Sequence, residues 1–194
     1  MITDAPYTEP TPEYFNTPEP AVWAVGIDLS LTGTGLAIVD EVSIRTHLFT
    51  SKGKKDASLA ERANRLNDLT NSITQSIPSG ALVVIEQPAY SQTGGSHHDR
   101  SGLWWLVLTA LHPYHRVVEV APGTVKKFAT GKGNAGKDEM LAAAIRRYPD
   151  AEVVNNNVAD AVHLAAMGAR HLGHPQETDT VKITEAMEVP RWNA

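Results

Sequence analysis

Three carboxylate residues interrupt otherwise apolar segments of this 194-residue chain. Asp28 is the only charged residue in the stretch 22–39, and Glu86 follows the apolar run 81–85. Asp160 lies in an alanine-rich segment near the end of the chain. A carboxylate in a central strand is costly unless it is hydrogen-bonded, paired or bound to a metal. Taken alone, Asp28 is equally compatible with a structural role and with a metal-binding or catalytic role.

The elements that must position these acids are predicted from apolar periodicity and turn residues. The predicted order is strands over 22–29, 35–40 and 42–50, a helix over 58–77, a strand over 81–85, a loop over 89–102, a helix over 103–111, a strand over 117–120, a short helical piece from 122, and helices over 137–148 and 158–171. In this order the first and fourth strands are expected to lie side by side. Asp28 and Glu86 would then meet at one edge of the sheet, and the last helix would bring in Asp160.

Three converging carboxylates repel one another, and their pKa values rise unless cations lie between them. Mg²⁺ prefers oxygen ligands of this kind and leaves positions open for water and phosphate. The sequence therefore predicts a Mg²⁺ site, with Mn²⁺ as an alternative ion.

Composition limits the class of protein. The length favours one domain, and the 42% hydrophobic content is ordinary for a globular protein. The sequence contains no cysteine, which excludes disulfides, thiolate zinc sites and a cysteine nucleophile. It shows no apolar run of membrane-spanning length, and its first residues do not resemble a signal peptide. We therefore expect no membrane partner and a cytoplasmic location, in a bacterium or a phage-infected host.

The formal net charge of −5 is unevenly distributed along the chain. Residues 1–20 carry four acids and no Lys or Arg, and residues 171–194 carry four acids against two basic residues. Subtracting these charges of −4 and −2 from −5 leaves +1 for residues 21–170. We predict a disordered acidic, Pro-rich arm over 1–20, a domain over 21–172 and a loosely held C-terminal tail over 173–194 with room for one short helix. The domain can still present a basic face to phosphates.

Four segments together resemble the successive motifs of RuvC-type Holliday junction resolvases, which belong to the ribonuclease-H-like superfamily. They are Gly26-Ile27-Asp28-Leu29-Ser30, Val84-Ile85-Glu86-Gln87-Pro88, the basic stretch 122–137 and Ala159-Asp160-Ala161-Val162. The resemblance covers residues 22–172, and the chain length is that of a phage-type resolvase. It implies an α/β fold: a ribonuclease-H-like mixed five-stranded sheet with helices on both faces.

The resemblance also implies a function. A protein of this family would be a homodimeric, Mg²⁺-dependent endonuclease that resolves four-way DNA junctions by paired symmetric nicks. By this analogy Asp28, Glu86 and Asp160 would hold a pair of metal ions, one activating water and one stabilising the leaving 3′ oxygen. Lys137 matches a basic residue near the scissile phosphate, where negative charge develops in the transition state.

Two residues near Asp160 have open roles. Three residues before it, where the family often has an acid, this chain has Asn157, which is either an uncharged metal ligand or a helix N-cap. His163 follows Asp160 by one helical turn and is either a ligand or supporting residue at the metal site or a buried, hydrogen-bonded histidine.

The basic stretch also suggests DNA contacts. Lys126, Lys127 and Lys132 flank the predicted site and are candidate phosphate contacts. Tyr90 lies close to the family's aromatic wedge, although its register differs by one residue. Lys52, Lys54 and Lys55 are equally well explained as phosphate contacts and as a solvated turn. His97 and His98 are read as loop residues, and Trp104 and Trp105 as core or dimer-interface residues.

The sequence leaves three alternatives open. ATP-binding folds also begin with a Gly-Ile-Asp-Leu strand and a Gly/Thr turn, but they need two such domains, and this chain has room for one. A junction-binding protein that has lost cleavage is suggested by Asn157. A nuclease for other branched DNA, such as flaps or forks, would use the same acids with different loops.

Overall fold

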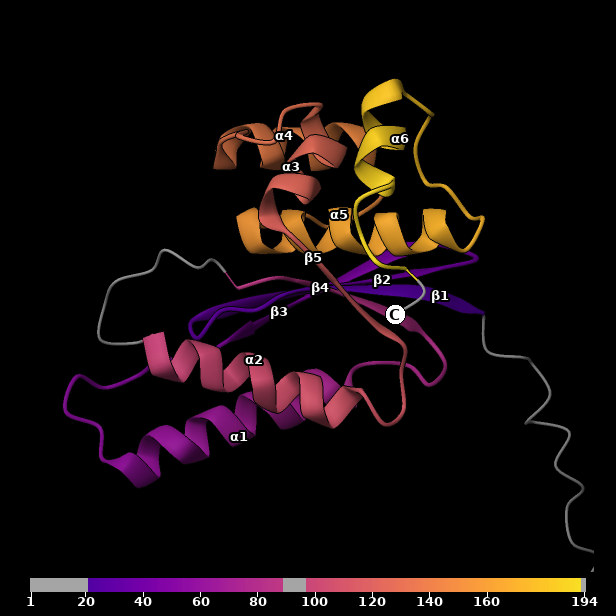
Figure 1. Ribbon diagram of the computed structural model, residues 1–194. Helices are drawn as coiled ribbons and strands as arrows, with labels where there is room; N and C mark the ends of the chain where they lie inside the picture. The colour runs from indigo at the N-terminus through magenta and orange to yellow at the C-terminus, as the bar shows by residue number, and fades with distance from the viewer. Residues whose placement is uncertain (1–20, 89–96, 193–194) are drawn as a thin grey trace, which may run out of the picture.

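A computed structural model describes residues 21–88 and 97–192 of the chain (Figure 1). The predicted acidic arm over 1–20 lies outside these residues. Within them, no helix combines the length and apolar character needed to cross a membrane. The elements, in chain order, are β1 (Val22–Asp28), β2 (Gly33–Asp40), β3 (Ile44–Thr50), α1 (Leu59–Gln75), β4 (Leu82–Glu86), α2 (His97–Leu111), β5 (Val117–Val120), α3 (Pro122–Thr130), α4 (Lys137–Arg147), α5 (Asn156–His171) and α6 (Val181–Met187).

The strands form one mixed five-stranded sheet in the order β3-β2-β1-β4-β5. β2 is antiparallel to both of its neighbours, β1 and β3, whereas β1, β4 and β5 run parallel. Because β4 pairs with β1, the expectation that the first and fourth strands lie side by side is confirmed. Their parallel register brings their carboxyl ends, and the acids there, to the same edge of the sheet.

Helices cover both faces of the sheet, with α1 and α2 on one side and α3 to α6 on the other (Figure 1). Side chains alternate between the two faces along each strand, as the pleat requires. In β4, Val83 and Ile85 join the core beneath α1 and α2, whereas Leu82 and Val84 join the core beneath α5. The sheet is therefore buried on both sides, which explains the continuous apolar runs of its central strands.

Helix α5 lies unusually close to the sheet because glycines face it. A Cβ atom on Gly26 of β1 would stand 2.1 Å from the Ala161 carbonyl oxygen, and one on Gly35 of β2 would stand 2.1 Å from that of Asn157. On the helix itself, a Cβ on Gly168 would come within 2.7 Å of Ala24. These contacts set the short distance between α5 and the strands β1 and β2.

The start of α2 differs from the prediction. Residues 97–102 were expected to belong to a loop, but α2 begins at His97, so both His97 and His98 are helical. Asp99 in the first turn forms an ion pair with Arg62 of α1. This tertiary contact, together with an acid near the helix N-terminus, favours the helix over the loop that the nearby Gly and Ser residues suggested.

The C-terminal tail also differs, because the described residues 173–192 pack on the domain. In α6, Ile183 and Ala186 are buried in the core that includes Phe128 of α3. Arg170 at the end of α5 forms ion pairs with Glu177 and Asp179. The prediction of one short helix is confirmed, and that of a loosely held tail is wrong for these residues.

Candidate active site

Asp28 and Glu86 end adjacent parallel strands. The residues before them, Ile27 and Ile85, are partners in the register of β1 and β4. Along their strands, Asp28 and Glu86 are on the same face of the sheet as Ala24 and Val84, which is the face covered by α5. Strand pairing therefore places both half-buried carboxylates next to each other on the α5 side of the sheet edge.

Helix α5 supplies the third acid. Gly35 is the register partner of Asp28, and it lies directly beneath the backbone of Asn157. Gly26, two residues before Asp28, lies beneath Ala161. Asp160 belongs to the helical turn between these two contacts. The close approach of α5 therefore brings the Asp160 carboxylate to the two strand-end acids.

The pKa values show that the three carboxylates share one environment. Burial is the main cause of each rise in pKa: that of Asp28 rises to about 7, that of Glu86 to about 8 and that of Asp160 to about 6. The charge of Asp160 raises the pKa of Asp28 further, and both aspartates raise that of Glu86. Strongly raised pKa values in a group of mutually repelling acids are a signature of a functional site.

Two lysines face this cluster. Lys126 of α3 lowers the pKa of Glu86 and of Asp160, and Lys137, the first residue of α4, lowers that of Asp28 and of Asp160. Helix α3 follows β5, whose last residue, Val120, pairs with Glu86. The crossover thus brings Lys126 to the same edge, and the predicted place of Lys137 beside the acids agrees with these charge interactions.

The donor set fits hard divalent cations, because it consists of carboxylate oxygens. The Oδ1 atom of Asp160 is buried and accepts no hydrogen bond from the described residues. Across residues 21–88 and 97–192, no three His, Asp or Glu side chains are arranged to hold one ion. Mg²⁺ is commonly held by one or two carboxylates together with substrate phosphates, so a site completed by DNA needs no such triad.

The amide of Asn157 makes a contact that the sequence did not predict. Its Nδ2 atom donates a hydrogen bond to the carbonyl oxygen of Gly33, which ties the start of α5 to β2. The N-cap of α5 is instead Asn155, whose side chain accepts a hydrogen bond of 3.0 Å from the Val158 N–H. The N-cap interpretation of Asn157 is therefore wrong, and a metal contact through its Oδ1 atom stays a prediction.

His163 is fully buried and lies in the helical core between α4 and α5. Its Nε2 atom donates a 3.2 Å hydrogen bond to the Met140 carbonyl oxygen, and the ring packs edge-on against Tyr148. Burial lowers the pKa of His163 to about 4, so the ring is neutral at pH 7. The structure therefore agrees with the interpretation of His163 as a buried, hydrogen-bonded residue.

Two of the remaining candidate DNA contacts, Lys127 and Lys132, form ion pairs with neighbouring acids. Lys127 points to α6 and forms a 2.7 Å ion pair with Glu185. Lys132 forms a 3.0 Å ion pair with Glu139. Ion pairs between partly or largely exposed side chains contribute little energy, so both lysines remain able to exchange the carboxylate for a phosphate. Tyr90 lies outside the described residues.

Other residues at the site were not identified from the sequence. Asn156 precedes Asp160 by one helical turn, and its Oδ1 atom is also buried without a hydrogen bond from the described part of the chain. The i, i+4 spacing to Asp160 was the available signal. Trp104 donates a hydrogen bond of 3.1 Å from Nε1 to the Glu86 carbonyl oxygen and so fixes the end of β4. Its burial was predicted, but this hydrogen bond was not.

This arrangement defines a class: an α/β protein with a ribonuclease-H-like sheet that carries a carboxylate and lysine cluster at the carboxyl ends of its central strands. Two solved structures share the fold. A Thermus thermophilus RuvC structure matches with a TM-score of 0.59 and 18% identity, over 80% of this chain and 99% of that one. T. thermophilus RuvC in complex with a Holliday junction substrate matches with a TM-score of 0.59 and 20% identity, over 81% and 100%.

Curated relatives identify the family. A crossover junction endodeoxyribonuclease RuvC from Chlamydia trachomatis serovar L2 is 30% identical over 160 residues, covering 79% of this chain and 94% of the relative. A protein of the same name from Rickettsia prowazekii is 29% identical over 148 residues, covering 73% and 92%. No family model matches the sequence. The chain belongs to the RuvC family.

Proposed function

We propose that this protein is a divalent-metal-dependent endonuclease that resolves four-way DNA junctions by paired symmetric nicks, with Mg²⁺ as its ion and Mn²⁺ as an alternative. The observation that carries the proposal is the cluster of Asp28, Glu86 and Asp160, whose pKa values are raised by burial and by one another's charge. The RuvC relatives named above are crossover junction endodeoxyribonucleases, and a solved relative is bound to a Holliday junction. This substrate would place the enzyme in the bacterial cytoplasm.

The proposed reaction is hydrolysis of a phosphodiester bond. The oxygen of a water molecule bonds to phosphorus, the bond to the 3′ oxygen breaks, and a proton passes to that oxygen. Cations held by the three carboxylates would supply an activated water and neutralise charge on the leaving oxygen. Lys137 and Lys126 face the same cluster and would stabilise the charge that develops on the phosphate. Asn157 is a further candidate ligand, whereas the hydrogen bond of His163 to Met140 favours a structural role for that residue.

Paired nicks require two active sites, so we propose a homodimer. Trp105 on α2 supports this, because its side chain is 60% exposed while its neighbour Trp104 is buried. A groove of about 930 Å³ lies beside it and is also lined by Leu108 and Val189. Exposed aromatic residues next to an apolar groove are typical of protein interfaces.

The substrate is tested by single-turnover nicking of a mobile four-way junction, a linear duplex, a flap and a fork, each with Mg²⁺, with Mn²⁺ and with EDTA. We expect paired symmetric nicks in the junction, slower cutting of the other DNAs and none in EDTA. Preferential cutting of flaps or forks would keep the chemistry and contradict the junction assignment. Tight junction binding without cutting in either ion would show a binding protein instead of an enzyme.

A further inference from the structure

A second basic segment lies at the same edge of the sheet as the carboxylates. Thr50, the last residue of β3, pairs with Gly33, the first residue of β2. Gly35, which also belongs to β2, pairs with Asp28 of β1. The backbone N–H of Ser51 donates a hydrogen bond of 3.3 Å to the Thr32 carbonyl oxygen in the turn after β1. The segment 51–55, which contains three lysines, therefore starts beside the turn that follows Asp28.

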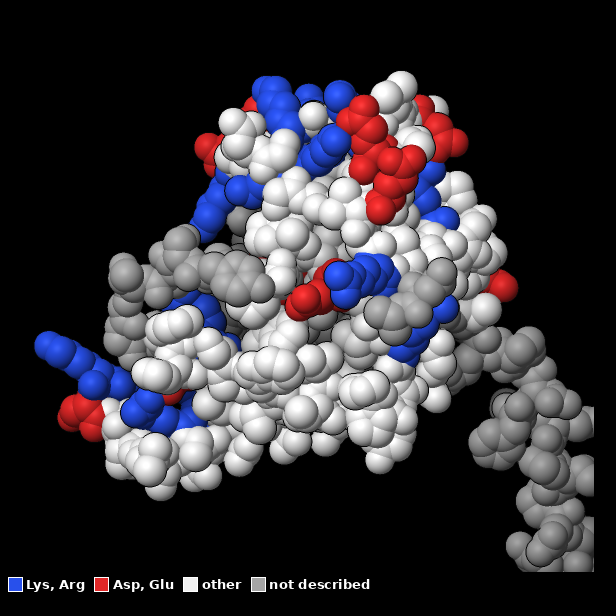
Figure 2. All heavy atoms as spheres, viewed as in Figure 1, with Lys and Arg blue, Asp and Glu red and all other residues white. Residues whose placement is uncertain are grey.

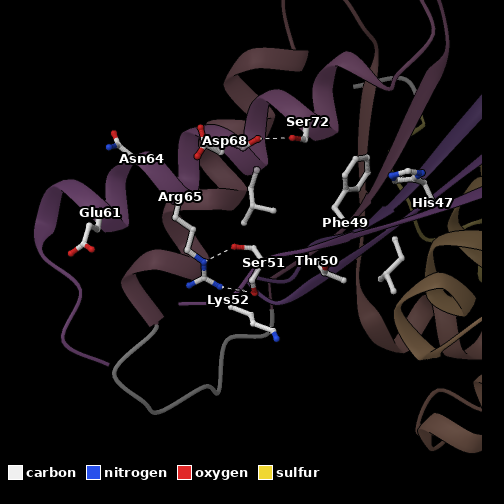
Figure 3. A pocket seen from close by; sticks show the side chains of 12 residues that line it. His47, Phe49, Thr50, Ser51, Lys52, Glu61, Asn64, Arg65, Asp68 and Ser72 are labelled. Carbon is white, nitrogen blue, oxygen red and sulfur yellow. Dashed lines mark hydrogen bonds between the residues drawn. The ribbon is translucent and has the colours of Figure 1, made fainter. Parts of the chain in front are cut away.

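Arg65 of α1 holds this segment in place (Figure 3). Its Nε atom donates a hydrogen bond of 2.7 Å to Ser51 Oγ, and its Nη2 atom donates to the carbonyl oxygens of Ser51 and Leu31. A Cβ atom on Gly53 would stand 2.4 Å from Arg65 Nη1, so the backbone passes directly over the guanidinium. One side chain thus links the segment to the turn after β1.

The lysines of the segment have different surroundings. Lys54 forms a 3.3 Å ion pair with Glu61, which also completes the capping box of α1 with Ser58. Lys52 and Lys55 are exposed, and within residues 21–88 and 97–192 neither forms an ion pair. In Figure 3 Lys52 points away from Asp68, an acidic residue that lines the groove of about 610 Å³ between β3 and α1. Lys52 also lines this groove, whereas Lys55 is not among its lining residues.

The position of the segment complements that of the other lysines. Lys126 and Lys137 reach the acids from α3 and α4, which cover one face of the sheet, whereas residues 51–55 lead into α1 on the other face. Figure 2 shows Lys and Arg side chains on both sides of this edge, near α3 and α4 and near the start of α1. DNA that lies along the edge to reach the carboxylates would meet positive charge from both faces.

We propose that Lys52 and Lys55 bind backbone phosphates of the DNA substrate on the α1 side of the active site, and that Arg65 is a positioning residue that holds their segment. This inference rests on the proposed function, because it assigns a further contact to the same substrate. Lysine contacts to phosphate release counterions, so each contact adds close to one unit to the slope of log affinity against log salt.

The test measures binding of the wild-type protein to a four-way junction in EDTA, which prevents cleavage, at salt concentrations from about 50 to about 200 mM. Lys52→Ala/Lys55→Ala should weaken binding severalfold and reduce the salt slope by about 2. Lys52→Arg/Lys55→Arg should keep the wild-type slope. The matched control is Arg116→Ala, because Arg116 is an exposed cation before β5, at the opposite end of the sheet from Glu86.

Arg65→Lys tests the positioning role separately. It keeps the charge but cannot make the same set of hydrogen bonds, so junction affinity should fall while the thermal midpoint of unfolding confirms a folded protein. A wild-type slope in the Lys52→Ala/Lys55→Ala variant, or an equal loss in Arg116→Ala, would overturn the inference while leaving cleavage and the proposed function intact. A wild type that binds no junction would refute the proposed function and this inference together.

Discussion

Acidic residues occur in two contrasting environments in this molecule. Asp40 accepts hydrogen bonds from the backbone N–H groups of Val42 and Ser43 and pairs with Arg45. Burial alone would raise the pKa of Asp40, but these interactions outweigh it, so the pKa is lowered. Burial, and to a smaller extent the charge of Asp160, raises the pKa of Asp28 to about 7 in contrast. The first kind of acid stabilises the fold. The second kind costs stability and is explained by a ligand that neutralises it.

The largest predicted effect is a loss of cleavage activity, which distinguishes the clustered acids from the stabilising ones. Asp160→Asn should reduce junction cleavage by roughly a thousandfold or more, because it removes a ligand of the proposed metal site. Its unfolding free energy should not fall, because one repelling charge is lost. Single-turnover cleavage and thermal unfolding would measure both. Asp138→Asn, a change at an exposed acid beside Lys137, is the matched control and should retain activity.

The next effect concerns the contact that brings Asp160 to the sheet. Gly26→Ala would place a methyl group 2.1 Å and 2.3 Å from backbone atoms of Ala161 and Ala165, which cannot turn aside. We expect a loss of about 3 kcal/mol in the free energy of unfolding, together with reduced cleavage. In the control Gly102→Ala, the new methyl lies 3.5 Å from a Leu66 methyl group, so unfolding by urea should show little change.

A smaller effect is expected for the stabilising acids. Asp40→Asn should lower the free energy of unfolding by about 1 kcal/mol, since it weakens charge-assisted hydrogen bonds at the β2–β3 turn. Cleavage should stay at the wild-type rate, because this turn lies at the opposite end of β2 from Gly35, the register partner of Asp28. Lost cleavage with unchanged stability would reverse the proposed division of the acids.

The last effect is a pH dependence of stability, which only the acids with raised pKa values produce between about pH 5 and pH 8. The raised pKa values of Asp28, Glu86 and Asp160 mean that the folded protein binds more protons than the unfolded chain between about pH 4 and pH 8. In EDTA, stability should therefore fall as pH rises from 5 to 8, by on the order of a few degrees in melting temperature. Acids such as Asp40 are ionised in both states over this window and add no slope there.

The same measurement of melting temperature against pH can be repeated with added Mg²⁺. Bound cations require ionised carboxylates, so added Mg²⁺ should raise the melting temperature more at pH 8 than at pH 6. Asp28→Asn should flatten both dependences. Equal stabilisation by Mg²⁺ at the two pH values in the wild type would contradict a metal site made of these acids.

Much of the fold and of the proposed site could be predicted from the sequence, because strands with acids at their ends leave a strong pattern. The pairing of β1 with β4 and the grouping of Asp28 with Glu86 both follow from element order and strand polarity. The expected proximity of Asp160 agrees with its charge interaction with both residues. Local patterns of this kind need no knowledge of side-chain packing.

The remaining features depend on contacts between residues distant in sequence. The helical start at His97 is supported by the ion pair of Asp99 with Arg62, and the amide of Asn157 is held by Gly33, 124 positions away. The role of Arg65 could not be seen from its sequence neighbourhood, because its partners lie in two other loops. The docking of α6 likewise depends on a few buried residues such as Ile183, in a segment whose composition is that of a tail.

The most direct test of the central claim compares the wild type with Asp28→Asn on a four-way junction in Mg²⁺, with cleavage and binding measured on the same samples. Our account predicts paired symmetric nicks by the wild type, no detectable nicks by the variant, and unchanged junction affinity. Cleavage by Asp28→Asn at the wild-type rate would contradict the assignment of the carboxylate cluster as the active site. Loss of binding together with cleavage in a correctly folded variant would equally contradict it, because Asp28 would then hold the DNA instead of the metal.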